Sequence, residues 1–464
     1  MLALSHSQSR ASLLIKTLVQ PRGPGHGARA LGSTRSYTAG SLKINAARMM
    51  DSLHETCKWG AAHPYGSGPT ETGMSRLTLD DNDFKARRWL AKEAESLGCT
   101  TKVDKMGNMF MFRPGKHQGH ATAVGSHLDT QPTGGRYDGI LGIHAALEAF
   151  RTIHENKLQT EYPLCLVNWT NEEGARFPKS ITGSSVWNGD LALDKAWALQ
   201  DVKDASITMR DELERGGFLG DVEASYESNP LAAHFELHIE QGPILESTGK
   251  KVGIVQGGQA YRWIDVNVHG RDCHTGSTPF ETRSDAMLCA SRIIVESNRI
   301  AKEHGGLAST GILRLSPGSV NTCPGHVFFT LDIRHPSTER LAALTSAIEA
   351  RSRAVAGTGS ERGCRLEWLE TFHSPAVEFH PDCISSVREA VEANYGAESG
   401  IDVFSGAGHD TCATSKRCPS SMVFITSRDG VSHNPLEYSS PEDCAIGAQV
   451  LMDAALVYDA RRTA

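Results

Sequence analysis

The pattern of hydrophobic and polar positions divides the chain into three regions. From Asp51 to about residue 259, short apolar runs such as "HATAVGSH" and "YPLCLVNW" alternate with longer segments. The runs are typical of buried strands, whereas residues 81–99 and "GILGIHAALEAFRTIHE" have the length and spacing of helices. Strands that alternate with helices predict an α/β domain with a mainly parallel central sheet.

Between residues 260 and 375 the pattern is different. "YRWIDVNVHG" and "GHVFFTLDIRH" alternate apolar and polar residues, and "CRLEWLETF" is a further predicted strand. Two helical segments, residues 283–305 and 337–356, separate these strands. We therefore predict an inserted α+β domain with two helices on one antiparallel sheet. Residues 51–259 and 376–464 would together form the interrupted α/β domain, because the earlier pattern returns after residue 375.

The first fifty residues differ from both domains. They contain Lys and Arg at seven positions but no acidic residue before Asp51, and they are rich in Ser and Gly. "RASLLIKTLVQ" can form a short amphipathic helix, a composition typical of a mitochondrial transit peptide. The alternative is a disordered leader without a targeting role, in which case we expect a cytoplasmic protein. On the first interpretation the protein lies in the mitochondrial matrix.

The composition argues against several classes of protein, namely nucleic-acid-binding, membrane-spanning and disulfide-stabilised proteins. The chain of 464 residues is long enough for two domains with ample cores, and its net charge of -7 argues against a nucleic-acid partner. No apolar run is long enough to span a bilayer, so no membrane partner is expected. The eleven cysteines are scattered, with no CxxC pair. This pattern favours free thiols in a reducing compartment over a disulfide framework.

Imidazoles and carboxylates recur in five short motifs, most of them after predicted strands. The motifs are "SHLDT", "GGRYDG", "TNEEG", "HFELHIEQGP" and "RDGVSHNPLEY". Such side chains are ligands suited to zinc and similar divalent ions. Adjacent carboxylates at Glu172 and Glu173 repel each other unless a cation compensates them. One of them can then bind metal while its neighbour acts as general base on a water that two metals polarise.

The ordered set of motifs resembles a known family. "GSHLDT", "GGRYDG", "TNEEGARF", "HIEQGP", "HTGSTP", "GHD" and "SHNPLEY" are similar to motifs of dizinc amidohydrolases, relatives of aminoacylases and carboxypeptidase G-type enzymes. The branch includes N-carbamoyl-L-amino acid hydrolases, yeast-type β-alanine synthase (β-ureidopropionase) and allantoate amidohydrolases. The resemblance runs from about residue 60 to the C-terminus. His238 stands where the wider family usually has an acid, which points to the carbamoyl-hydrolysing branch.

The resemblance implies a role for each matching residue in the metal centre. It implies five metal ligands: His127 and His238 on one ion, Glu173 and His433 on the other, and Asp138 bridging both. Glu172 would be the general base and then the acid that protonates the leaving nitrogen. Asp129 would hold the His127 imidazole from behind. No ligand position departs from the family pattern.

The resemblance also implies residues that contact the substrate. Gln241 would contact the carbamoyl or acyl end, and His409 in "GAGHD" would be a further substrate contact. His274 in "RDCHTGSTP" would stabilise the tetrahedral oxyanion and would be delivered by the partner subunit of a homodimer. Asn321 and Arg334 would hold the substrate carboxylate, for which a planar guanidinium is well suited.

The implied reaction is hydrolysis of an N-carbamoyl amino acid to the amino acid, ammonia and carbon dioxide. The inserted domain would be a lid and a dimerisation domain, and its closure would exclude water. Two divalent ions per subunit are expected, with zinc favoured and manganese as the alternative. Allantoate, an N-acyl amino acid or a dipeptide are alternative substrates. A protein of another class, a non-catalytic metal-binding scaffold, is disfavoured by Glu172 beside Glu173.

Overall fold

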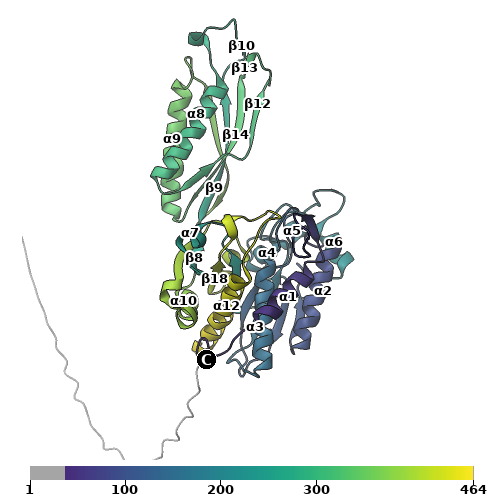
Figure 1. Ribbon diagram of the computed structural model, residues 1–464. Helices are drawn as coiled ribbons and strands as arrows, with labels where there is room; N and C mark the ends of the chain where they lie inside the picture. The colour runs from purple at the N-terminus through teal and green to yellow at the C-terminus, as the bar shows by residue number, and fades with distance from the viewer. Residues whose placement is uncertain (1–36, 463–464) are drawn as a thin grey trace, which may run out of the picture. The chain divides into compact units, whose positions relative to one another are not determined.

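The computed structural model describes residues 37–462, which contain the two predicted domains (Figure 1). Two segments of the chain form an α/β domain, and an α+β domain is inserted between them; we call them the catalytic domain and the lid, after the roles that the resemblance implies. The lid starts at β9 (Ala260–His269) and ends with β15 (Arg365–Ser374). Among the described residues, no helix is both long and apolar enough to cross a lipid bilayer.

A nine-stranded mixed sheet forms the centre of the catalytic domain. Strands β6, β5, β7 and β18 lie side by side and run parallel, as the sequence predicts for the centre of the sheet. On one side β4 and β3 extend the sheet antiparallel, while on the other β8 is antiparallel to β18 and β17 pairs parallel with β8. The strands are β3 (Thr100–Val103), β4 (Met109–Arg113), β5 (Ala121–His127), β6 (Leu164–Trp169), β7 (Leu231–Ile239), β8 (Val252–Gly258), β16 (Val377–Glu378), β17 (Gly400–Ser405) and β18 (Ser420–Ile425).

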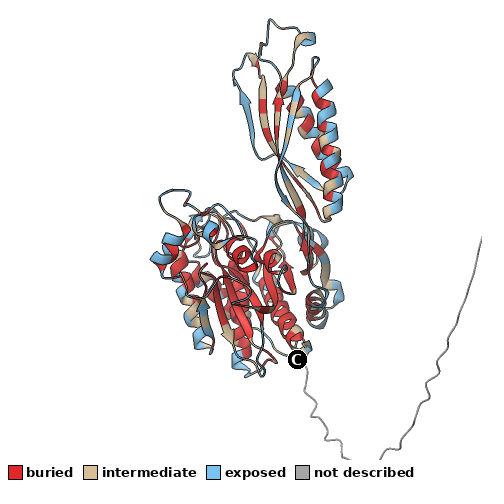
Figure 2. Cartoon of the chain, turned by 180° about the vertical axis from the view of Figure 1, so that it is seen from behind, coloured by how far each residue is buried: buried red, intermediate tan, exposed pale blue. Residues whose placement is uncertain are grey.

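Helices cover this sheet and bury its central strands. The residues of β5 and β6 are buried throughout, because parallel strands in an α/β fold are covered on both faces (Figure 2). The long helices α3 and α12 pack against each other and against β5 and β7. The helices are α1 (Ala46–Thr56), α2 (Asp81–Ser96), α3 (Ile140–Glu155), α4 (Thr182–Asn188), α5 (Leu193–Trp197), α6 (Met209–Gly216), α7 (Ile244–Thr248), α10 (Pro381–Tyr395), α11 (Asp410–Thr414) and α12 (Pro441–Arg461).

The lid is the predicted α+β unit with its own hydrophobic core. Its antiparallel sheet has the order β11-β14-β9-β15, with β12 also paired to β14, and α8 and α9 pack on one face. A separate two-stranded ribbon joins β10 to β13 (Figure 1). The remaining elements are α8 (Ala286–Glu303), α9 (Thr338–Thr358), β10 (Cys273–His274), β11 (Leu307–Ser309), β12 (Leu313–Ser316), β13 (Thr322–Cys323) and β14 (His326–His335).

The structure corrects the predicted end of the leader at residue 50. Residues 37–50 belong to the catalytic domain, because Met49 and Met50 of α1 are buried in its core. Asn45 caps this helix, and the Tyr37 hydroxyl donates a hydrogen bond to Asp453 of α12. The helix was overlooked because a basic, acid-free composition extends into it. Residues 1–36, which carry the rest of the predicted leader, lie outside the described residues.

Candidate metal centre and active site

Three neighbouring parallel strands bring the predicted ligands to one edge of the sheet. His127 is the last residue of β5, Glu172 and Glu173 follow β6, and His238 lies near the end of β7. Since β6, β5 and β7 are adjacent and parallel, their carboxyl ends meet where α/β sheets collect ligands. Loops complete the group. Asp138 comes from the segment between β5 and α3, and His433 from the segment before α12.

The five predicted ligands form two overlapping groups of potential metal-binding atoms. His127, Asp138 and His238 make one group, and Asp138, Glu173 and His433 make the other; within each group the atoms lie within 4.8 Å of one another. Asp138 is shared. Its Oδ1 lies 3.0 Å from His238 Nε2 and 3.5 Å from His127 Nε2, and its Oδ2 lies 3.5 Å from His433 Nε2. One carboxylate oxygen therefore faces each group, as a bridging ligand requires.

The hydrogen bonds of the imidazoles prepare them to bind metal through Nε2. His127 Nδ1 is 2.9 Å from the Asp129 main-chain oxygen, and His238 Nδ1 is 2.9 Å from that of Ile239. A carbonyl can only accept, so both rings carry a proton on Nδ1, and Nε2 is the nitrogen that would bind a metal once it has no proton. His127 Nε2 is buried and has no hydrogen-bond partner. These residues fit a pair of divalent ions, because a cation would satisfy this nitrogen and the surrounding carboxylates.

Burial and charge shift the proton affinities of these groups. Burial raises the pKa of Glu173 to about 7, and it raises the pKa of Glu172 well above its usual range. Burial acts in the same direction on Asp138, but His238, His127 and His433 outweigh it and hold the pKa of Asp138 well below its usual value. In the metal-free protein, protons on these buried glutamates therefore provide part of the charge compensation that bound cations would give.

The paired glutamates diverge from a tight turn. Asn171 has a positive φ of 59°, and the Asp129 carboxylate accepts the main-chain N–H groups of Glu172 at 3.4 Å and Glu173 at 3.3 Å. Glu173 then points towards His433, 3.4 Å from its Nε2, whereas Glu172 Oε2 lies 3.6 Å from His127 Nε2. The turn thus directs Glu173 to the predicted ligand group and leaves Glu172 beside that group, where a general base would act.

Asp129 contacts His127 mainly through its main chain. Its carboxylate lies 3.9 Å from His127 Nδ1, farther than the 2.9 Å of its carbonyl oxygen. The side chain instead holds the Glu172–Glu173 turn. Asp129 is therefore placed to orient both the imidazole and the two carboxylates, each with a different part of the residue.

Sequence reasoning missed three supporting residues. Glu437 is buried, and its Oε1 accepts the N–H groups of Tyr137 and Asp138, each at 3.0 Å. Ser432 donates to Asp138 Oδ2 at 2.9 Å, and Gln131 donates to Glu173 Oε2 at 2.7 Å. Glu437 lies in the quoted motif "SHNPLEY", so its acid within a ligand motif was the available signal. Nothing in the local sequence marks Ser432 or Gln131.

A cavity of about 230 Å³ adjoins the ligands and is also lined by the lid residues Tyr261, Trp263 and Arg334. Asp332 accepts hydrogen bonds from Arg334 Nε at 2.9 Å and Nη2 at 2.7 Å, and from Trp263 Nε1 at 3.2 Å. The Arg334 guanidinium lies over the Tyr261 ring at 5.0 Å. Neighbouring positions on β9 and β14 therefore form one charged and aromatic surface.

The structure places Gln241 and His409 at the same cavity. Gln241 Nε2 donates to Asp138 Oδ2 at 2.7 Å, while its Oε1 is buried without a hydrogen-bond partner. The His409 ring lies 4.4 Å from that of His238, and burial lowers the pKa of His409 to about 3. His409 is therefore a neutral imidazole beside the ligand group.

His274 lies in β10 and Asn321 directly precedes β13 of the lid, and neither lines the cavity. His274 is exposed, and its Nδ1 accepts the N–H groups of Gly276 and Ser277, each at 3.2 Å. Its Nε2 consequently carries the proton and can donate. Asn321 is adjacent, since its main-chain oxygen accepts the N–H of Thr275 at 2.9 Å.

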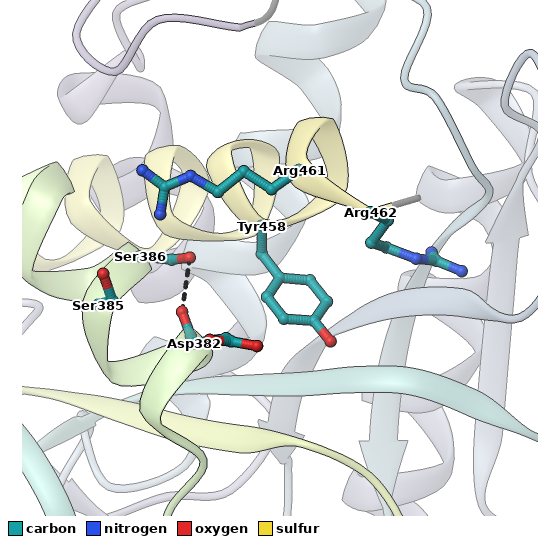
Figure 3. Close-up of a pocket in the computed structure, with 6 residues that line it drawn as sticks. All are labelled: Asp382, Ser385, Ser386, Tyr458, Arg461 and Arg462. Carbon is teal, nitrogen blue, oxygen red and sulfur yellow. Dashed lines mark hydrogen bonds between the residues drawn. The ribbon is translucent and has the colours of Figure 1, made fainter. Parts of the chain in front are cut away.

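A second pocket, of about 490 Å³, lies between α10 and α12 (Figure 3). Its walls include Asp382, Tyr458 and Arg461, and Arg461 is already paired with Glu389 on the neighbouring helix. None of the predicted site residues lines this pocket. The predicted ligands Asp138, Glu173, His238 and His433 instead line the smaller cavity at the strand ends.

This cavity has the ligand arrangement of a two-metal hydrolase, and the comparisons assign the chain to a family. Residues 123–457 match the model of peptidase family M20/M25/M40, and the chain belongs to this family. It is 40% identical over 420 residues to an N-carbamoyl-L-amino-acid amidohydrolase of Rhizobium meliloti, covering 89% of this chain and 96% of the relative. An allantoate amidohydrolase of Bacillus subtilis is 31% identical over 409 residues, covering 87% and 96%.

A solved structure supports the same assignment. The crystal structure of a hydantoinase/carbamoylase family amidase from Burkholderia multivorans is similar to this chain with a TM-score of 0.84 at 39% identity. The match covers 91% of this chain and 100% of that structure. The predicted family and the combination of an α/β domain with an inserted lid are thereby confirmed.

Proposed function

We propose that this protein hydrolyses the N-carbamoyl group of an amino acid, giving the free amino acid, ammonia and carbon dioxide. The observation that carries the proposal is the Asp138-centred double group of ligands with Glu172 beside it. The name of the Rhizobium meliloti relative supports the carbamoyl substrate, and that of the Bacillus subtilis relative makes allantoate the second candidate. Both substrates end in a ureido group and carry a carboxylate.

The chain's own residues provide the proton transfers and the substrate contacts. Glu172 takes a proton from the attacking water and delivers it to the leaving nitrogen, which its raised pKa favours. Arg334 binds the substrate carboxylate, which Asn321 would join only from the partner subunit of a dimer, and Gln241 contacts the carbamoyl end through its unpaired Oε1. His409, neutral and buried at the cavity, is a further substrate contact. Two bound divalent ions, zinc or manganese, would polarise the water and the ureido carbonyl.

A homodimer would complete this site. His274 and Asn321 are remote from the cavity of their own chain but expose polar groups on the lid. Delivery of His274 by the partner subunit would place an Nε2–H donor where the tetrahedral oxyanion forms. For localisation, the basic and acid-free segment 1–36 supports import into mitochondria.

Ammonia release by the dialysed protein tests the function directly. The substrates are N-carbamoyl-β-alanine, N-carbamoyl-L-α-amino acids and allantoate, each with added zinc or manganese. We expect metal-dependent release from a carbamoyl amino acid, and in Glu172→Gln a kcat lower by about 10²–10⁴-fold with metal content unchanged. Hydrolysis of acyl amino acids alone would overturn the carbamoyl assignment. Full activity in Glu172→Gln would overturn the role of Glu172.

A further inference from the structure

The four cysteines of the lid are arranged as two pairs, although no sequence spacing marks them. Cys273 lies opposite Cys323 in the β10–β13 ladder, and Cys289 of α8 is a neighbour of Cys364. No described cysteine is in a disulfide. The seven other cysteines lie outside the lid. Paired thiols in one small domain are the arrangement from which disulfides form.

The first pair has the geometry of a cross-strand disulfide. Cys273 and Cys323 are directly opposite each other in the antiparallel β10–β13 ribbon. Opposite residues of such a ladder have Cα atoms about 4.5–5.5 Å apart, inside the range that a disulfide spans. Cys273 is half-buried and accessible to an oxidant, whereas Cys323 is only 7% exposed.

This ribbon also carries two residues of the predicted site. His274 directly follows Cys273, and Asn321 is two residues before Cys323. The ladder is short, because each strand contributes only two residues. A two-stranded sheet of this size is marginally stable in water, so its position depends on few hydrogen bonds. A covalent link between Cys273 and Cys323 would hold His274 and Asn321 at a fixed separation.

We propose that Cys273 and Cys323 are a reversible thiol–disulfide site that responds to low-molecular-weight disulfides such as oxidised glutathione. The accessible Cys273 thiolate attacks one sulfur of the glutathione disulfide, which forms a mixed disulfide and releases one glutathione thiolate. Cys323 thiolate then attacks the Cys273 sulfur and releases the second glutathione. The two protons of the protein thiols pass to the two glutathione thiolates. The net change is two protein thiols oxidised and one glutathione disulfide reduced to two thiols.

The second pair provides an internal comparison. Cys289 is fully buried in α8, and its thiol lies 3.9 Å from the Val355 main-chain oxygen. Cys364 is half-buried just before β15. Each pair has one half-buried thiol, but the buried partner differs, because Cys289 lies inside the lid core and Cys323 does not. We expect the ribbon pair to oxidise first.

Peptide mapping of the full chain tests the site independently of any substrate. The protein is incubated with oxidised glutathione, blocked with an alkylating reagent and digested. We expect one linked peptide that joins Cys273 to Cys323 and disappears on reduction with dithiothreitol. It should be absent from Cys273→Ser and Cys323→Ser, and it should persist in Cys364→Ser, which removes the other pair. Full alkylation of both ribbon thiols after oxidation, or mixed disulfides alone, would overturn the inference.

Hydrogen exchange tests the constraint on the ribbon. In the oxidised protein, amides of residues 270–282 and 318–326 should exchange more slowly, while those of α9 stay unchanged. Unchanged exchange in a fully linked ribbon would refute the constraint.

The effect on turnover rests on the proposed function: oxidation should change kcat in the wild type and not in Cys273→Ser. If no carbamoyl substrate is hydrolysed, the linked peptide still decides the redox site.

Discussion

At the scale of single residues, Asp138 is the central carboxylate of a strongly acidic candidate site. Its two oxygens face different imidazoles, and its main-chain N–H is held by the buried Glu437. Five carboxylates, those of Asp129, Asp138, Glu172, Glu173 and Glu437, are buried or nearly buried within this small region. Such a concentration of acid is stable only when protons or cations compensate it. Metal binding to the protein must therefore be linked to proton release.

Zinc affinity should rise from neutral pH towards about pH 9. The hydrogen bond to Asp138 raises the pKa of His433 to about 9, so the imidazole of the metal-free protein is protonated at neutral pH. A ligand must lose this proton before it binds, and raising the pH removes it in advance. Calorimetric titration of the metal-free protein with zinc, in buffers of different ionisation enthalpy, counts the protons released.

His433→Gln is the matched variant for this titration. Its proton release at neutral pH should fall by about one per site. An unchanged proton count in His433→Gln would show that His433 is not a ligand. Affinity independent of pH would contradict the linkage altogether.

At the scale of elements, β9 and β14 together build the lid side of the cavity. Asp332 sits opposite Trp263 in the ladder, and Arg334 sits opposite Tyr261. The Asp332 carboxylate holds the Arg334 guanidinium in a two-point contact, which fixes its direction but also neutralises part of its charge. Asp332 is thus a positioning residue for the predicted carboxylate contact.

Arg334→Ala should raise KM for a carbamoyl amino acid by about 10–100-fold, because the substrate carboxylate loses one or two hydrogen bonds to a charged group. In Asp332→Asn the guanidinium loses its two-point contact, so KM should rise less than in Arg334→Ala while kcat stays close to wild type. Leu369→Ala, at an exposed lid position that does not line the cavity, is the control. Equal KM values in wild type and Arg334→Ala would exclude this contact.

Helix α2 contains a buried ion pair whose arginine also contacts the β3–β4 turn of the sheet. Asp83 Oδ2 lies 2.7 Å from Arg87 Nε with both side chains fully buried, and Arg87 also donates to the Gly107 carbonyl in the β3–β4 turn. Arg87→Ala leaves a buried carboxylate unpaired, so the free energy of unfolding should fall by about 3–5 kcal/mol in urea denaturation.

The Arg353–Glu349 pair has the same i,i+4 spacing on α9 but is exposed. Arg353→Ala should cost about 0–1 kcal/mol. If Arg87→Ala lowered the free energy of unfolding no more than Arg353→Ala does, burial would not determine how much the Asp83–Arg87 pair contributes to stability.

Local sequence patterns predict most elements because helix and strand periodicities are local. The predicted helix at residues 81–99 is α2, and "GHVFFTLDIRH" is β14 with its alternating burial. Pairing partners are not local, which is why the antiparallel pairing of β4 with β6 and of β8 with β18 was not predicted. The metal motifs name the ligands, but the hydrogen bond from Asp138 to Glu437 joins residues 299 positions apart. No short motif contains such a pair.

At the scale of the whole molecule, the two hydrophobic cores are separate, and all five predicted ligands belong to the catalytic domain. Metal binding would join the ends of β5 and β7 to the segment after β6 and to the loop that carries His433. The lid contributes no ligand. A bound ion therefore stabilises only part of the molecule, by about 4 kcal/mol when its free concentration is about 1,000 times Kd.

Hydrogen exchange with and without a chelator should reveal this division. Chelation should accelerate exchange in β5, β7 and residues 170–182, and zinc should restore the slow rates. Helices α8 and α9 should exchange equally in both conditions, because their core is that of the lid alone. Acceleration that is uniform across both domains would mean that they unfold as one cooperative unit. Unchanged exchange around His127 and Glu173 would mean that no metal is bound there.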